Sequence, residues 1–403
     1  MFLVVLGQLV LRWLILFAQD LGAAWPPTGP IERVLACSAL LVDAMTVLRV
    51  LAQDRFTMTP STQQPLLVVH AGTHKTASSY IQNRLDANQL ALDSQGVVLS
   101  WPGRPGRKHK GLVKAMLKGS HTPWERYLSA ASPATWQLLV SAEQFTPAVT
   151  EPRHLAFLDE VARRHGRTLR VVVFLRDQPD FLNSMYAHTV RRLYHHYDFD
   201  SYVRRRLRHP NWFPDYSRWL EAIRRHPTIE LLVLPYRSAA VDQKGKDEPL
   251  DDPFMRLAHA LGWAMPGQGW LPPSRRSINT QVGARGIWLA LEVGKALAAR
   301  GVNPRSLRNT GGLIREISER EGWTHPRFQG FQPADYLRLR ETLEAANDPL
   351  AMEAWGVPWA EVFPSVPQPR SITIGPESNQ DAQRMDACLQ EALSRLLKQV
   401  DSA

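Results

Sequence analysis

Short runs of apolar, β-branched residues alternate with longer segments of helical apolar spacing between residues 65 and 235. The runs predict strands at 66–70, 97–100, 137–141, 169–175 and 229–234, and the spaced segments predict helices at 76–90, 153–165, 179–194 and 213–225. Strands that alternate with helices pair in parallel through right-handed crossovers. We therefore expect an α/β fold of three layers, α/β/α, around a central, mainly parallel sheet whose ligands bind outside the carboxyl ends of the strands.

Helical patterns flank this region on both sides. A Pro/Gly break at 25–30 separates two apolar helical segments before residue 60, and helical spacing returns after Gln281, at 313–320, 334–346 and 381–400. The expected domains are an apolar helical extension at 1–60, a nucleotide-binding domain at 61–300 and a helical extension at 301–403.

The first eighteen residues are apolar enough to raise the question of membrane contact. They lack the basic start of a signal peptide, and Arg12 in their middle would cost about 2.5–3.5 kcal/mol in a spanning helix. Gln8, Arg12 and Gln19 fall on one helical stripe, which is the pattern of a helix lying on a bilayer surface or against protein. Three alternatives stay open for residues 1–18: peripheral contact with a membrane, a membrane-spanning helix, and no membrane contact.

The segment HAGTHKTASS at 70–79 joins the first predicted strand to the first predicted helix. Gly72 permits a tight turn, and Lys75 with the hydroxyls of Thr76, Ser78 and Ser79 lies where the helix begins. The unpaired N–H groups and the positive dipole end of a helix start favour an anion. The usual ATP/GTP loop reads G-x-x-x-x-G-K-[ST], whereas here His74 replaces the second glycine, which argues against an ordinary NTPase.

A second strand-to-helix segment, VVVFLRDQPDFLNS at 171–184, ends its strand on Arg176. Ser184 follows eight residues later, on the next predicted helix, so the two side chains can meet one phosphate from two sides. The planar guanidinium fork suits this role because it donates two hydrogen bonds at once.

Together these segments resemble the 5′-phosphosulfate loop and the 3′-phosphate motif of the sulfotransferases that use 3′-phosphoadenosine 5′-phosphosulfate (PAPS). Weaker similarities at 138–145, 252–263 and 274–281 extend the resemblance from about residue 65 to about residue 281. The resemblance implies a P-loop NTPase-like fold. It also implies that the chain transfers a sulfuryl group from PAPS to a hydroxyl or amine of a carbohydrate, lipid or small molecule.

The resemblance also implies a set of donor-binding residues. The 5′ side is Gly72, Thr73, His74, Lys75, Thr76, Ala77, Ser78 and Ser79, the 3′-phosphate site is Arg176 and Ser184, and the far side is Arg275 and Arg276. Lys75 is the expected catalytic cation, because an ammonium beside the bridging oxygen stabilises charge that grows only as the bond breaks.

Two residues are candidates for the base that deprotonates the acceptor. His109 has an ordinary pKa near 6.5 for its residue type, suited to proton transfer at neutral pH, and resembles a histidine in many bacterial members of the family. Glu143 follows the strand at 137–141, where related enzymes that act on glycans often carry a carboxylate. The sequence leaves both open.

Composition narrows the remaining possibilities. A net charge of +10 and a pI near 9.8 favour anionic ligands, and nucleic acid is not the expected partner. Only Cys37 and Cys388 occur, and the histidines are scattered, so we expect no metal, no disulfide and a cytoplasmic location. The alternative functions are a P-loop kinase or NTPase, and a non-catalytic nucleotide- or polyanion-binding protein of the same fold. The acceptor and the oligomeric state do not follow from the sequence.

Overall fold

The computed structural model describes residues 64–99, 109–129, 131–132, 134–208, 215–237, 252–273, 282–364 and 375–401. The chain divides into two compact units, Met1–Gln63 and Gln64–Ala403, and all described residues belong to the second. The predicted N-terminal helices, the membrane contact considered for 1–18, and Arg275 with Arg276 lie outside the described residues. Within the described part, no helix is both long enough and apolar enough to cross a bilayer.

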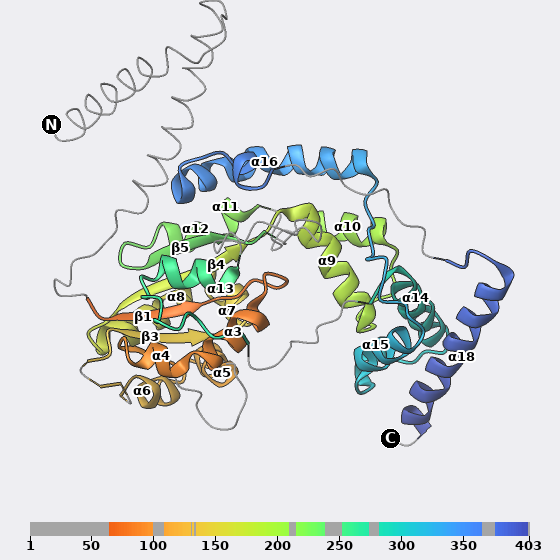
Figure 1. Cartoon of the computed structure of the whole chain (residues 1–403), viewed down its shortest axis with the longest axis horizontal. Helices are drawn as coiled ribbons and strands as arrows, with labels where there is room; N and C mark the ends of the chain where they lie inside the picture. Colours follow the sequence, from red (N-terminus) through yellow and green to blue (C-terminus); the bar gives the residue numbers. More distant parts are fainter. Residues whose placement is uncertain are drawn as a thin grey trace, which may run out of the picture. The chain divides into compact units, whose positions relative to one another are not determined.

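Five strands form one sheet in which every neighbouring pair is parallel, in the order β2-β3-β1-β4-β5 (Figure 1). The strands are β1 (Leu66–His70), β2 (Val97–Val98), β3 (Gln137–Ser141), β4 (Thr168–Leu175) and β5 (Glu230–Pro235). The α/β class and the parallel sheet are therefore confirmed. Because β1 lies between β3 and β4, the loops that follow these three strands leave the same edge of the sheet.

Alternating side chains of the strands enter two separate cores, one on each face of the sheet. In β1, Leu67 and Val69 belong to one core, and Leu66 and Val68 belong to the other. The first core packs the sheet against α5 (Lys110–Leu117), α6 (Thr122–Ser129), α7 (Phe145–Ala148), α8 (Pro152–Arg164), α11 (Tyr216–Trp219), α12 (Glu221–Arg224), α16 (Pro333–Trp355) and α17 (Trp359–Val362). The second packs it against α3 (Ser78–Ala87), α4 (Gln89–Asp93) and α13 (Pro253–Ala260).

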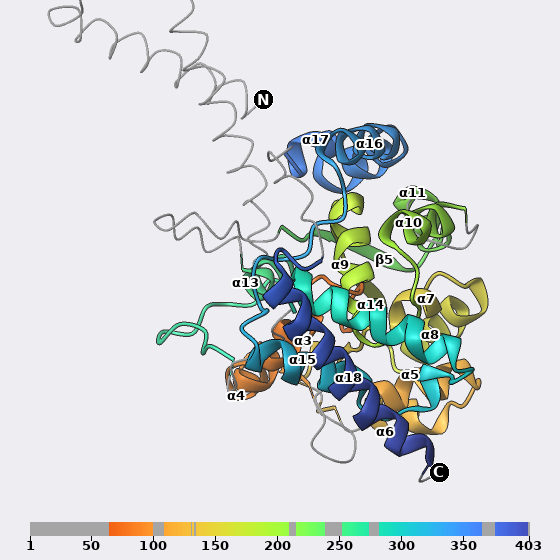
Figure 2. The ribbon, with the colours of Figure 1, turned by 90° about the vertical axis from the view of Figure 1, so that its right-hand side faces the viewer.

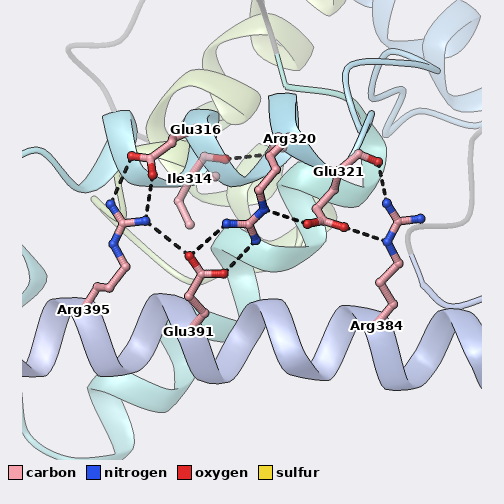
Figure 3. A network of polar contacts seen from close by, with 8 residues as sticks. Ile314, Glu316, Arg320, Glu321, Arg384, Glu391 and Arg395 are labelled. Atoms are coloured by element: carbon pink, nitrogen blue, oxygen red, sulfur yellow. Dashed lines mark hydrogen bonds and ion pairs between the residues drawn. The ribbon is translucent and has the colours of Figure 1, made fainter.

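A third core joins helices without the sheet. It contains side chains from α9 (Gln178–Arg191), α10 (Phe199–Leu207), α14 (Ala284–Ala299), α15 (Thr310–Arg320) and α18 (Asn379–Asp401), and the 3₁₀ helix η3 (Pro304–Ser306) connects α14 to α15. Figure 2 shows α18 running beside α14 and α15. Ion pairs support the contact of α18 with α15: Arg320 on α15 donates to Glu391 on α18, and Arg395 on α18 donates to Glu316 on α15 (Figure 3).

The C-terminal helices share the cores of the preceding residues. Trp359 on α17 is fully buried in the first core beside Tyr216, at a ring-centroid distance of 5.6 Å. The described helices after residue 301 therefore complete two of the three cores.

Element boundaries differ from the sequence-based predictions at a few places. The predicted helix 76–90 begins at Ser78 and is interrupted at Asn88. The Asn88 side chain donates to the Leu271 carbonyl and accepts from the Leu271 N–H. The predicted helix 213–225 is two short helices that meet at Leu220. The predicted helix 334–346 instead runs as α16 to Trp355, with Pro349 inside it. The pattern gave no prediction for α5, α6 or α17.

Candidate functional site

The loop after β1 turns tightly because Gly72 lies against the start of α3. A Cβ built on Gly72 would lie 2.3 Å from Ser78 Oγ and 2.8 Å from Ser78 Cβ, which is closer than real side chains approach. Only glycine fits this position without a shift of the backbone or of Ser78. The loop therefore folds back directly onto the first residue of the helix.

Two residues of the loop have a left-handed backbone. Lys75 has φ 66° and Ala77 has φ 59°, a region that residues with a side chain rarely adopt. Such strain is commonly found where backbone N–H groups are held toward a ligand. The first turn of α3, which has no side-chain cap, adds further unpaired N–H groups at the same place.

Hydroxyl groups hold this strained shape from inside. Thr76 Oγ1 donates to the Thr73 carbonyl at 2.7 Å, and Ser78 Oγ donates to the same oxygen at 3.2 Å. The Thr73 hydroxyl in turn donates to the carbonyl of Phe174 in β4. All three hydroxyl-bearing residues are buried, so they fix the loop to the sheet.

A cavity of about 540 Å³, which we name the strand-end cavity, opens at this edge of the sheet. Lys75 after β1, Glu143 after β3, Arg176 after β4 and Tyr236 after β5 all line it. Its volume is in the range of small-molecule sites. Residues from four strand ends thus meet at one cavity.

Arg176 and Ser184 line the cavity from β4 and α9. The Arg176 side chain donates to the Lys75 carbonyl at 3.4 Å, lies 3.8 Å from Asp180 and stacks over Tyr236 at 5.6 Å. Ser184 is 6% exposed, and its Oγ, like Arg176 Nε, has no hydrogen-bond partner among the described residues. Buried polar atoms without partners are uncommon, and here two of them border one cavity.

The cavity carries a strong excess of positive charge. Among the described residues that line it, Glu143 is the one carboxylate, and the cations are Lys75, Lys110, Arg176, Arg191, Arg192 and Arg315. Burial, followed by the neighbouring Arg191 and Arg176 guanidinium groups, lowers the pKa of Lys75 to about 8. Burial together with Lys75 lowers the pKa of His188 to about 3, so this imidazole is neutral at pH 7. An anion would relieve the repulsion among these groups.

The donor-binding residues predicted from the sequence divide into two sets. His74, Lys75, Ala77, Ser78, Ser79, Arg176 and Ser184 line the strand-end cavity. Gly72, Thr73 and Thr76 are not among the described residues that line it, and they shape the loop from behind.

The two candidate bases have different surroundings. His109 is 1% exposed, its Nδ1 accepts from the Ser141 N–H at 3.0 Å, and its ring packs against Tyr127. It is not among the described residues that line the cavity. Glu143 does line it, and Glu143 Oε2 lies 3.6 Å from His74 Nδ1. Of the two candidate bases, Glu143 is therefore the one that lines the cavity.

The sequence predicted α9 as a helix, but His188 and Arg191 on it were not predicted as site residues. His188 and Arg191 follow Ser184 by four and seven residues, so the three side chains lie along one helix face, and all three line the cavity. Helical spacing counted forward from Ser184 would have found His188 and Arg191. Arg315 is on α15, so helical spacing from Ser184 could not have identified it.

Among the residues that the structure describes, no group of three or more His, Cys, Asp or Glu side chains could hold a metal ion. We compared the chain with protein-family models, with curated proteins and with solved structures, and none of them gave a match.

Proposed function

We propose that the protein is a PAPS-dependent sulfotransferase with a P-loop NTPase-like fold. One observation carries the proposal: the cation of the β1 loop and the Arg176–Ser184 pair line the same cavity, which is large enough for one nucleotide. A nucleotide with phosphates at both the 5′ and 3′ positions would bind both groups of residues, with its 5′ end at the Lys75 loop and its 3′-phosphate at Arg176 and Ser184. A nucleoside triphosphate has no 3′-phosphate, so it would leave Arg176 and Ser184 without a ligand.

The residues present suit such a donor. The backbone at Lys75 to Ser79 and the start of α3 would hold the 5′ end through N–H groups. The unpaired atoms Ser184 Oγ and Arg176 Nε would hold the 3′-phosphate. Tyr236, already stacked with Arg176, adds an aromatic face to the same wall.

The donor supplies an activated sulfuryl group. In a direct in-line transfer, a bond forms between the acceptor oxygen and sulfur while the bond from sulfur to the bridging 5′-phosphate oxygen breaks, leaving adenosine 3′,5′-bisphosphate. The Lys75 ammonium would stabilise the negative charge that develops on the bridging oxygen. Its pKa of about 8 leaves it charged at pH 7 in the free protein, and a bound anion would raise that pKa.

Glu143 is the better-placed base for the acceptor hydroxyl. Its carboxylate lies in the cavity beside His74, whereas Nδ1 of His109 already accepts a backbone N–H behind the sheet edge. We propose that Glu143 takes the proton of the hydroxyl and that His109 positions the end of β3 through Ser141.

The proposed partners are PAPS and a hydroxyl-bearing acceptor, without a metal and without nucleic acid. The scarcity of cysteine supports a cytoplasmic location.

Calorimetric titration with adenosine 3′,5′-bisphosphate and with ATP tests the proposal. We expect the bisphosphate to bind at least about tenfold more tightly, a difference of about 1.4 kcal/mol. Tight binding of ATP with weak binding of the bisphosphate would instead indicate a kinase or NTPase.

Lys75→Ala separates catalysis from binding. We expect it to lower transfer from radiolabelled PAPS at least about 100-fold, as the loss of a transition-state cation does, while the bisphosphate still binds. The matched control is Lys114→Ala, because Lys114 is an exposed lysine on α5 that does not line the cavity. If PAPS binds but no variant or wild-type protein transfers sulfate to any acceptor, the protein is a nucleotide-binding protein without turnover.

A further inference from the structure

A second cavity of about 720 Å³, which we name the arginine cavity, lies beside the strand-end cavity. Arg191, Arg192 and Arg315 line both cavities, so the two share one wall. Arg305 also lines the arginine cavity, and no acidic side chain is among the described residues around it. Four guanidinium groups therefore border a space that no described carboxylate lines.

Arg191 is the most unusual of these residues. Its side chain is only 8% exposed, yet it makes no hydrogen bond or ion pair with the described residues. A buried, unpaired charge is costly, and proteins keep one mainly where a ligand completes it. Burial and the neighbouring Arg315 and Arg192 guanidinium groups lower the pKa of Arg191 to about 10, which still leaves it charged at neutral pH.

The start of α15 faces the same cavity. Asn309, Thr310, Gly311 and Gly312 line it, and Asn309 caps the helix with a left-handed backbone but no side-chain hydrogen bond. The Thr310 hydroxyl donates to the Arg192 carbonyl at 3.0 Å, so the helix start is fixed against the end of α9. Its unpaired N–H groups and its dipole add to the attraction for an anion.

Tyr194 supplies a ring at the outer side of the cavity. The Arg192 and Arg305 guanidinium groups lie 6.0 and 5.8 Å from the centre of its ring, and Arg192 donates to its hydroxyl at 3.2 Å. The ring is 45% exposed, so it remains accessible to a ligand. An aromatic face between cations suits a sugar or other ring that bears an anionic group.

We propose that the arginine cavity binds an oxyanion carried by the acceptor, so that the substrate of transfer is itself an acidic molecule such as a uronate, sulfated or phosphorylated saccharide. The identification of the bound molecule as the sulfuryl acceptor rests on the proposed function. The oxyanion site itself is argued from the lining of the arginine cavity alone. The shared wall places an acceptor held there next to Lys75 and Glu143, where its hydroxyl would react.

The test uses the full chain with adenosine 3′,5′-bisphosphate present at saturation, so that the strand-end cavity is filled. Calorimetry then compares glucose with glucuronate, glucose 6-sulfate and glucose 6-phosphate, and thermal unfolding compares sodium sulfate with sodium chloride at equal ionic strength. The variant is Arg305→Gln, since Arg305 lines only the arginine cavity. The control is Arg308→Gln, which removes an exposed arginine three residues away whose backbone alone bonds Gln399.

We expect at least one charged sugar to bind at least about tenfold more tightly than glucose, with a loss of about fivefold or more in Arg305→Gln and none in Arg308→Gln. Which sugar binds best identifies the carboxylate, sulfate or phosphate as the anion. Sulfate should also raise the unfolding temperature of the wild type and of Arg308→Gln more than that of Arg305→Gln.

Equal binding of glucose and the charged sugars, or equal behaviour of Arg305→Gln and the wild type, would overturn the inference. Failure of the proposed function has a different signature. In that case the bisphosphate itself does not bind, while the sulfate effect and its dependence on Arg305 can still be measured.

Discussion

The loop that follows β1 depends on a single glycine. We expect Gly72→Ala to lower the free energy of unfolding by about 1–3 kcal/mol, because the new methyl group would overlap Ser78. The second substitution Ser78→Ala removes the closer of the two overlapping atoms and should restore part of the loss. Gly111→Ala is the control, since no atom lies within 4 Å of a Cβ there. Chemical denaturation measures all four proteins, and an unchanged Gly72→Ala would contradict the loop geometry.

Lys75 should make stability depend on pH. Its pKa falls from 10.5 in the unfolded chain to about 8 in the folded protein, mainly through burial. Between about pH 8 and pH 10.5, Lys75 is protonated in the unfolded chain and largely deprotonated in the folded protein. The contribution of Lys75 to the free energy of unfolding therefore rises with pH in this range. Lys75→Met should therefore be more stable than the wild type at pH 7, by about 1–3 kcal/mol, and the difference should shrink toward pH 10.5.

Urea denaturation across this pH range measures the effect of Lys75, with Lys114→Met as the exposed control. A difference between Lys75→Met and the wild type that stays constant with pH would contradict the buried position of the ammonium.

At the level of residues, the sequence predicted the strand-end side chains best. Lys75, Glu143 and Arg176 each follow an apolar run, and a parallel sheet brings such positions to one edge. It could not separate lining from supporting residues: Thr76 and Ser79 look equivalent in the motif, but only Ser79 lines the cavity. Arg315 was beyond prediction because its place depends on how α15 packs against α9.

Among the helices, α9 matters most for the site, and buried polar contacts fix its start. Asp177 precedes its first turn and is 5% exposed; Trp359 Nε1 and the Tyr336 hydroxyl donate to its two carboxylate oxygens at 3.1 and 3.0 Å. Burial raises the pKa of Asp177, and the hydrogen bond from Trp359 opposes this. Helices α16 and α17 thus hold the residue next to Arg176.

Tyr336→Phe tests this brace. It leaves one oxygen of a buried carboxyl group without that donor, so we expect a loss of about 1–3 kcal/mol in the free energy of unfolding. Tyr197→Phe is the control, because the Tyr197 hydroxyl has no hydrogen bond within the described part of the chain. Equal unfolding curves for Tyr336→Phe and the wild type would mean that the brace carries no stability.

Element boundaries followed the sequence where local signals were strong. The strand at 66–70 and the strand at 137–141 agree with the structure because a continuous apolar run bounded by polar residues marks each of them. The break at Asn88 did not follow, since it depends on backbone bonds to Leu271, far along the chain. Likewise, α16 continues past residue 346 because Leu350 and Ala351 pack in the first core.

At the scale of the whole molecule, positive side chains of the described residues gather where the two cavities meet. The described residues pair many of their surface arginines with carboxylates, as in the contact of α15 with α18 (Figure 3), whereas Arg191 between the cavities has no such partner. The full chain carries a net charge of +10, and composition alone could not show that some of its cations line two adjoining cavities. The parallel sheet followed from the sequence, but the shared wall of arginines required the tertiary structure.

The central claim is that one nucleotide spans the loop of Lys75 and the pair Arg176–Ser184. The most direct measurement is a thermodynamic cycle that compares adenosine 3′,5′-bisphosphate with adenosine 5′-monophosphate on the wild type and on Ser184→Ala. Ser184 Oγ has no partner within the described residues, so its removal should leave the fold intact. We predict a coupling of about 1.5–3 kcal/mol between the 3′-phosphate and this hydroxyl. A coupling of zero, with both nucleotides bound equally by both proteins, would contradict the account.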